Sequence, residues 1–324
     1  MKLVWIAALV AACKPHAPAP LDTPPSPWSV GSDVPDPRYE PGVTALGQSV
    51  AVVDGWDTPT ELTTRVDLYD TTQRTWLAPL VDAPVARHDP QVAVIGTTLY
   101  LLGGLDTAET AHGDCYALDT GDGSATWQPI APIPPGFERG AAAVITTAPR
   151  IYLVGGQSSA GPIASMIFYD SIADAWTTTF TLPDLPVPLA RAAGLRRDDG
   201  TFVIAGGGSA NAYWLTPDQQ TGSGAWAELT PMPTATAGCA YGAIADQLLC
   251  AGGSAGGSAL ATMQGYASLD DSWTTYPAMP AARAGAGGIV IANSLYVVGG
   301  SDTVAIEPTS TLFVFTLNDV TGTQ

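Results

Sequence analysis

The side chains best suited to chemistry in this sequence are two histidines and an acid–base pair. His88 precedes Asp89, His112 follows in the next loop-like stretch, and Glu138 precedes Arg139. Imidazole and carboxyl groups are the usual general acids and bases of enzymes, and they also bind metal ions. If His88, His112, Glu138 and Arg139 converge, the chemistry would be acid–base or metal-binding; otherwise they are solvated loop residues.

A second group of candidates consists of arginines that recur at one place after a Trp. They are Arg38, Arg87, Arg139, Arg191 and Arg283, with Thr236 at the equivalent place in the remaining copy. Recurrence favours a structural role, such as bonds to loop carbonyls, although arginine also binds carboxylates bidentately. The candidate binding residues are therefore Arg38, Trp56, Arg87, Arg191 and Arg283.

The elements that position these residues form a repeat. Six glycine-ended apolar runs, among them LYLLGG at 99–104 and LYVVGG at 295–300, have their second glycines at 55, 104, 156, 207, 253 and 300. Tryptophans at 28, 76, 127, 176, 226 and 273 follow a similar period near 49. A Tyr or Phe lies between these two landmarks, at Tyr69, Tyr116, Tyr169, Tyr213, Tyr266 and Phe313. Each unit therefore predicts four short strands separated by turns.

The order of Gly-Gly, Tyr and Trp over residues 28–318 resembles the kelch repeat, whose units form the blades of a β-propeller. The resemblance implies that the glycines end the second strand of each blade, the Tyr lies on the third and the Trp on the outer fourth. We then expect the recurring glycines and aromatic residues to pack the blades rather than to form ligand sites. The expected fold class is all-β, with four antiparallel strands per blade.

The number of landmarks predicts six blades and the way the ring closes. Trp28 precedes the first glycine doublet, and the last doublet has no Trp after it. The segment around Trp28 should therefore supply the outer strand of the blade formed by residues 283–318. Such closure leaves no open sheet edge.

Two faces of this propeller differ in their loops. The loops that join blades and those between the second and third strands share one face, where function is expected in residues that break the repeat. Such residues are Tyr39, Glu40, Trp56, Asp57, Glu61, His88, Asp89, Asp106, Glu109, His112, Glu138, Asn211, Asp302 and Glu307.

The N-terminal residues predict where the protein is located in the cell. Residues 1–12 form a short apolar run after Lys2, typical of a secretory signal, and Val10-Ala11-Ala12-Cys13 resembles a bacterial lipobox. Acyl chains on Cys13 would anchor the protein, with Pro-rich residues 13–27 as the tether and 28–324 as the propeller. The expected location is the bacterial cell envelope, on the outer membrane or the cell surface. An ordinary signal peptide with a chance Cys is the alternative.

Composition excludes several classes of protein. The chain has 12 Lys and Arg against 30 Asp and Glu, for a formal net charge of −18. Such a balance argues against nucleic-acid binding, which needs clustered positive charge. No metal or cofactor is predicted, because no CxxC or His-rich signature is present. Cys239 and Cys250 are expected to be about 10 Å apart, too far for a disulfide, so buried thiols are favoured over a bridge.

Two functions compete. The first is a non-enzymatic binding or scaffolding module that holds a protein or glycan on one propeller face. The alternative is a sugar-active enzyme: kelch propellers of six blades include sialic-acid mutarotases that use acidic and basic channel residues, a role that Glu138 with an Arg would fill. A copper oxidase of the galactose-oxidase type is disfavoured, because the required Tyr, His and Cys ligands are not recognisable.

Overall fold

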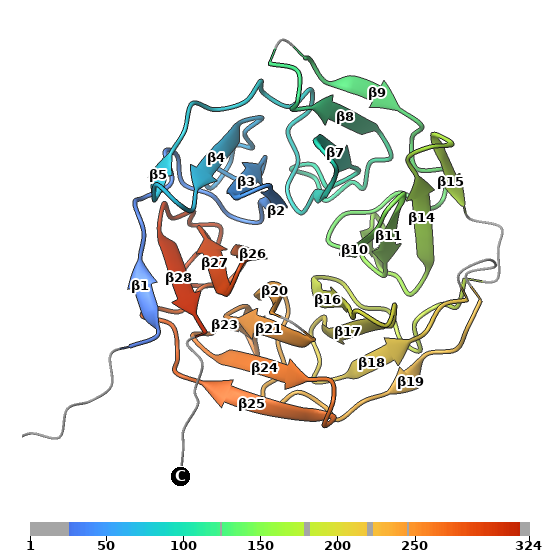
Figure 1. The fold of residues 1–324 in the computed structure, drawn as a ribbon, viewed down its shortest axis with the longest axis vertical. Coiled ribbons are helices and arrows are strands. Elements are labelled where there is room, and N and C mark those ends of the chain that lie inside the picture. Colours follow the sequence, from blue (N-terminus) through green and yellow to red (C-terminus); the bar gives the residue numbers. More distant parts are fainter. Residues whose placement is uncertain (1–25, 124, 178–181, 219–222, 245, 318–324) are drawn as a thin grey trace, which may run out of the picture.

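The computed structural model describes residues 26–317, except residues 124, 178–181, 219–222 and 245. The predicted lipobox and most of the predicted tether lie outside the described residues. Six four-stranded antiparallel sheets are arranged in a ring around a central axis (Figure 1). The prediction of an all-β propeller with six blades is confirmed.

Each blade runs from an inner to an outer strand. Blade 1 contains β2 (Gly42–Leu46), β3 (Ser49–Val53), β4 (Val66–Asp70) and β5 (Thr75–Trp76). Blade 2 contains β6 (Gln91–Ile95), β7 (Thr98–Leu102), β8 (Cys115–Asp119) and β9 (Gln128–Ile130). Blade 3 contains β10 (Ala143–Thr147), β11 (Arg150–Val154), β14 (Met166–Asp170) and β15 (Ala175–Thr177).

The other three blades repeat this order. Blade 4 contains β16 (Ala192–Arg196), β17 (Phe202–Gly206), β18 (Ala212–Leu215) and β19 (Ala227–Glu228). Blade 5 contains β20 (Ala240–Ile244), β21 (Gln247–Ala251), β24 (Met263–Ala267) and β25 (Ser272–Tyr276). Blade 6 contains β26 (Gly287–Ile291), β27 (Ser294–Val298), β28 (Leu312–Thr316) and β1 (Trp28–Val30). Two small hairpins complete the fold, β12 (Gln157–Ser158) with β13 (Gly161–Pro162) and β22 (Ser254–Ala255) with β23 (Ser258–Ala259).

The N-terminal strand closes the ring as predicted. Strand β1 pairs antiparallel with β28, with Trp28 opposite Phe315 and Val30 opposite Phe313. Figure 1 shows β1, from the beginning of the described chain, on the outside of the blade that ends it. The first and last strands of the propeller therefore share one sheet.

The recurring tryptophans join neighbouring blades. Each of the six indole N–H groups donates a hydrogen bond to a backbone carbonyl just after the outer strand of the preceding blade. The acceptors of Trp28, Trp76, Trp127, Trp176, Trp226 and Trp273 are Pro277, Ser32, Val81, Ala131, Pro183 and Thr230, at 2.8–3.1 Å. Trp28 makes the same bond as the others, so the closing blade is joined like every other blade.

The glycine doublets end the second strands and allow neighbouring loops to approach. A Cβ atom on Gly103 would lie 2.6 Å from the carbonyl oxygen of Arg139, too close for any side chain. The first doublet position has a positive φ in every blade, including blade 1, where it is Asp54 with φ 57°. The doublets thus serve packing, as predicted from their recurrence.

Candidate functional site

Six loops between blades place one residue each at the mouth of the central channel. These residues form the axial ring: Glu40, Asp89, Ala141, Arg191, Gly238 and Gly285. All six have a positive φ, between 47° and 64°. Their backbones are joined by hydrogen bonds of 2.7–2.9 Å, from Asp89 N–H to Glu40, Ala141 to Asp89, Arg191 to Ala141, Gly238 to Arg191 and Glu40 to Gly285.

Three positions of the axial ring are chemically inert and three are charged. Ala141, Gly238 and Gly285 show that the loop needs no functional group here. Glu40, Asp89 and Arg191 adopt the same left-handed conformation at an energetic cost that glycine would avoid. Their charged side chains are therefore not needed to form the ring.

The charged side chains of the axial ring contact one another. The Nε of Arg191 donates to Asp89 Oδ2 at 2.8 Å. Its Nη2 lies 3.0 Å from Glu40 Oε1. The guanidinium group thus bridges two carboxylates that come from different blades.

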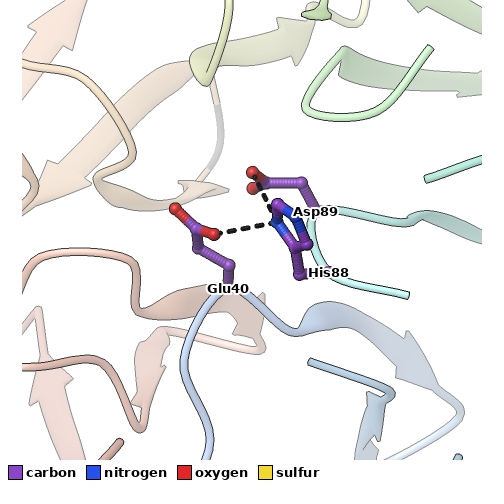
Figure 2. Close-up of side chains that lie close together, drawn as sticks. All are labelled: Glu40, His88 and Asp89. Atoms are coloured by element: carbon purple, nitrogen blue, oxygen red, sulfur yellow. Dashed lines mark ion pairs between the residues drawn. The ribbon is translucent and has the colours of Figure 1, made fainter. Parts of the chain in front are cut away.

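His88 lies behind this bridge and is fully buried. Its Nδ1 is 2.9 Å from Glu40 Oε2 and 3.6 Å from Asp89 Oδ2. Figure 2 shows the imidazole facing both carboxylates. The other nitrogen, Nε2, lies 3.1 Å from the carbonyl oxygen of Asp106, and the ring packs on Trp56 with centroids 5.2 Å apart. We call Glu40, His88, Asp89 and Arg191 the mouth cluster.

The protonation states of the mouth cluster follow from these contacts. Burial lowers the pKa of His88, but the hydrogen bonds and charges of Asp89 and Glu40 outweigh it and raise that pKa to about 10. Burial, with the nearby Asp89, raises the pKa of Glu40. Burial opposes ionisation of Asp89 as well, but Arg191 and His88 together lower its pKa. The cluster therefore combines two basic side chains with two carboxyl groups that contact them.

A metal ion is poorly matched to this arrangement. Donor atoms of Glu40, His88 and Asp89 lie within 4.8 Å of one another, which is a distance that a metal could bridge. His88, however, binds a proton between the carboxylates, and Arg191 contacts both of them. A metal ion would have to displace both cations.

The mouth cluster lies at one end of a cavity of about 330 Å³. Its walls are the inner strands, with small or aliphatic residues such as Val92, Val144 and Gly242. Tyr241 reaches from blade 5 toward blade 3, where its hydroxyl lies 3.5 Å from the backbone N–H of Val144. The channel is therefore a pocket of mixed polarity, with a charged mouth, an aromatic side chain across it, and Thr44, Thr146 and Arg196 also in its wall.

The predicted arginines have different environments from one another. Arg38 is fully buried and forms an ion pair with Asp67 at 2.7 Å. Arg139 is also fully buried and donates to the carbonyls of Phe137, Gly155 and Ser165. Both side chains are bound to the loops of the propeller, in the manner expected of a structural role.

Of the two further arginines at the recurring position, Arg87 is partly buried and Arg283 is buried, and one expected member does not belong there. Arg87 pairs with Asp114 at 3.2 Å, and Arg283 lies over the Phe313 ring at 5.0 Å. In blade 2, the second doublet glycine, Gly104, donates its N–H to the carbonyl of Arg139. In blade 3, the equivalent glycine, Gly156, donates to the carbonyl of Leu189, so Leu189 occupies the recurring position there. The assignment of Arg191 to the recurring position was therefore wrong. In the sequence LARAA, Arg191 lies two residues after Leu189, and it belongs to the axial ring.

The predicted trio of His88, His112 and Glu138 is brought together only in part. His112 Nε2 lies 2.9 Å from Asp106 Oδ2, so both histidines contact Asp106. Glu138 accepts a hydrogen bond from the N–H of Gly136 in its own loop. It lies outside the mouth cluster and does not line the cavity.

Sequence reasoning noted Glu40 and Asp89 as residues that break the repeat but did not select them. The signal that identifies them is the position two residues after the recurring Arg. That position is Ala141, Gly238 and Gly285 in three blades, so a carboxylate there is an exception. The sequence does not show that Arg191 reaches both.

The prediction about cysteines was also wrong. Cys239 and Cys250 form a disulfide, with Cα atoms 5.5 Å apart. Cys250 pairs with Tyr241, one residue closer than the expected 242 or 243, and the chain turns at Gly238 with φ 64°. This turn brings Cys239 beside β21. Cys115 is a buried free thiol.

Comparisons with known proteins agree with this fold. Residues 41–253 match the family model described as the KLHDC2/KLHL20/DRC7 Kelch-repeats domain. The chain is 31% identical over 237 residues to the Kelch-like protein terF of Aspergillus terreus (strain NIH 2624 / FGSC A1156), a match over 67% of this chain. It spans about half of that relative, 50% of its length.

A solved structure described as "Structure of YjhT" superposes with a TM-score of 0.74 at 17% identity, over 89% of this chain and 97% of the other. At this identity the likeness shows the fold. The fold and the repeated loops define a kelch-type β-propeller. The chain belongs to the kelch-repeat family, a fold that suggests a binding or scaffold module. Among the described residues, no helix is long and apolar enough to span a bilayer.

Proposed function

We propose that this protein is an exported, lipid-anchored kelch propeller that holds part of a protein or glycan partner at the mouth of its channel. The observation on which the proposal rests is the mouth cluster. Three charged residues occupy left-handed positions above a cavity, where three other blades use Ala or Gly. A pocket of about 330 Å³ is within the range of about 300–1,000 Å³ typical of small-molecule sites.

Two features support export. The apolar run of residues 3–10 followed by Cys13 is typical of a bacterial lipoprotein signal. The disulfide between Cys239 and Cys250 suits an oxidising compartment rather than the cytosol. The proposed location is therefore the cell envelope, with Cys13 lipidated and the propeller on the outer membrane or the cell surface.

The binding proposal is tested with a variant whose mouth lacks two of its charged side chains. The double substitution Glu40→Gly and Arg191→Gly copies Gly238 and Gly285, and it removes one negative and one positive group. We expect arrays of glycans and envelope proteins to yield a ligand that binds the native chain at least tenfold more tightly than the double variant. Asp270→Asn, at the turn between β24 and β25 on the other face, is the control and should bind normally.

The anchor is tested by Cys13→Ser in cells. We expect the native protein to sediment with membranes and the variant to be released into the soluble fraction. Cys115→Ala, which changes a cysteine inside the propeller, should leave fractionation unchanged. If Cys13→Ser still sediments with membranes, the anchor is wrong.

A sugar-active enzyme is the second candidate, and one observation favours it. Glu40 and Asp89 have pKa values shifted in opposite directions beside Arg191, the pattern of a general acid with a general base. The test is the rate of sugar anomerisation measured by NMR. Acceleration that Glu40→Gln abolishes would establish catalysis, and an unchanged rate would leave binding as the function.

A further inference from the structure

The charge balance of the mouth cluster defines which ligands it accepts. We propose that the channel mouth binds a neutral, hydroxylated group, the terminal sugar of an uncharged glycan. This inference rests on the proposed binding function and specifies its ligand. The mouth is then expected to bind neutral sugars in preference to sialic acids, uronic acids and amino sugars.

The first argument is electrostatic. The mouth cluster pairs Glu40 and Asp89 with His88 and Arg191, and the side chains of Glu40 and His88 are 9% and 0% exposed. An anionic ligand entering past Arg191 would meet two carboxyl groups, with Glu109 3.4 Å from His88 Nε2 as a further negative group. A cationic ligand would first meet Arg191, the most exposed member of the cluster at 29%. Either charge would remain uncompensated in a partly buried site, which is costly.

The second argument is the set of hydrogen-bonding groups that remain available. The contacts of Arg191 to Glu40 and Asp89 use Nε and Nη2, and Nη1 has no hydrogen-bond partner among the described residues. Asp89 accepts the Arg191 bond on Oδ2, which leaves Oδ1 as an acceptor. A hydroxyl group both donates and accepts. Two neighbouring hydroxyls of a sugar can therefore accept from Arg191 and donate to Asp89 without disturbing the cluster.

The third argument is the shape of the pocket below the mouth. The cavity wall contains Val92, Val144 and Ile289, with glycines on the inner strands between them. Tyr241 crosses the channel and contacts the backbone of Val144. A long chain cannot thread past this side chain, so the site accepts an end. The C–H faces of one sugar ring suit walls of this kind.

Calorimetry on the purified full chain tests the proposal with four probes. They are methyl galactoside and methyl glucoside as neutral sugars, N-acetylneuraminic acid as the anion and glucosamine as the cation. We expect at least one neutral glycoside to bind, and both charged sugars to bind at least tenfold more weakly. The Glu40→Gly and Arg191→Gly double variant should lose the neutral sugar, whereas Asp270→Asn should keep it.

Single variants test the charge balance directly. Arg191→Gly leaves the cluster with excess negative charge, so its preference should shift at least tenfold toward glucosamine relative to the neutral sugar. Glu40→Gln removes a negative charge and should shift the preference toward N-acetylneuraminic acid. Near-UV circular dichroism establishes that each variant is folded, and a variant that fails this measurement is replaced by Glu40→Ala or Arg191→Ala, which copy Ala141.

The outcomes separate this inference from the function beneath it. If a charged sugar binds the native chain as tightly as a neutral one, or if only an envelope protein binds and the double variant abolishes that binding, the neutral-sugar inference is overturned and the binding function stands. If every ligand found binds the double variant unchanged, both are wrong.

Discussion

At the scale of single residues, Asp54 departs most clearly from what the fold requires. It occupies the first doublet position, which is Gly103, Gly155, Gly206, Gly252 and Gly299 in the other blades. Asp54 is fully buried, and neither carboxyl oxygen has a hydrogen-bond partner among the residues that the structure describes. Burial raises its pKa well above the usual value. An unsatisfied buried polar group of this kind costs about 1–3 kcal/mol.

We therefore predict that Asp54→Gly stabilises the protein by about 1–2 kcal/mol at pH 7, after the entropic cost of glycine of about 0.5–1 kcal/mol. A carboxyl whose folded pKa is raised is favourable below its unfolded pKa and becomes unfavourable as pH rises. The gain from Asp54→Gly should therefore be larger at pH 8 than at pH 4.

Urea unfolding at both pH values measures this difference in free energy. Asp54→Asn is the control, because it keeps the size of the side chain and removes the titration. The reverse change, Gly103→Asp, should destabilise strongly, because its Cβ would lie 2.6 Å from a carbonyl oxygen. A lower stability of Asp54→Gly at both pH values would show that the carboxyl is used by the fold.

His88 gives the second residue-scale prediction. Its folded pKa of about 10 lies above its ordinary value of 6.5. The contribution of the charged imidazole to stability is therefore fully present below pH 6.5 and is lost as pH rises toward 10. Removing one partner of a buried ion pair costs about 3–5 kcal/mol, and the contact between Arg191 and Glu40 should keep the loss near the lower value.

His88→Gln should therefore cost about 3 kcal/mol at pH 6 and clearly less at pH 10. Unfolding in urea at four pH values between 6 and 10 gives the curve. His112→Gln is the matched control, since His112 is partly exposed and pairs with Asp106 at the surface. A difference between His88→Gln and the native chain that does not change with pH would mean that His88 is neutral.

At the scale of elements, strand β1 determines whether the ring closes. Trp28 is 7% exposed, packs on Phe315 with ring centroids 5.1 Å apart and donates to Pro277. Val30, on the same strand, is 64% exposed. Substitutions at Trp28 and Val30 therefore distinguish the contribution of the buried indole from that of an exposed side chain on the same strand.

We predict that Trp28→Ala lowers the free energy of unfolding by about 3–5 kcal/mol, the usual cost of removing a large buried aromatic side chain. Val30→Ala should change it by no more than about 0.5 kcal/mol. Thermal unfolding followed by Trp fluorescence and circular dichroism provides the values. Equal effects of the two substitutions would contradict closure by packing of the indole.

Element-scale features differ in how far they could be predicted. The spacing of the Gly, Tyr and Trp positions, together with its resemblance to the kelch repeat, predicted the blades and the closing strand, because these positions repeat with the packing they serve. Pairing of Cys239 with Cys250 could not be predicted, because it depends on a one-residue difference in register and on the turn at Gly238. A repeat determines which residues are equivalent, but not how a chain turns between two strands.

At the scale of the whole molecule, the repeat also does not determine which residues of different blades meet at the site. From the sequence, function was expected on the face that holds the loops between blades, and His88 and Arg191, which lie in the mouth cluster, were among the candidates. The convergence of Glu40, Asp89 and Arg191 needs closure of the ring, since these residues come from three different loops between blades. Only the closed propeller brings residue 40 to residue 191, and local sequence has no information on this distance.

Charge is the other property of the whole molecule, and it differs from the charge of the site. Residues 28–324 contain 10 Arg, no Lys and 29 acidic residues, a net charge of −19. Arg38, Arg65, Arg87 and Arg191 are already paired with carboxylates. The excess of negative charge therefore resides on surface carboxylates, which repel one another and destabilise the folded chain.

Salt should consequently stabilise this protein. The Debye length falls from about 30 Å at 0.01 M to about 3 Å at 1 M ionic strength. Added salt therefore weakens the repulsion between exposed carboxylates more than the attraction within buried ion pairs. We expect NaCl at 0.5 M to raise the melting temperature by about 2–4 °C over 0.01 M, equivalent to about 1 kcal/mol. Differential scanning calorimetry measures the shift.

A variant in which exposed Glu61, Asp302 and Glu307 are changed to amides should start from a higher melting temperature and gain less from salt. A fall in melting temperature with salt would mean that attraction between exposed ion pairs, rather than repulsion, dominates the surface.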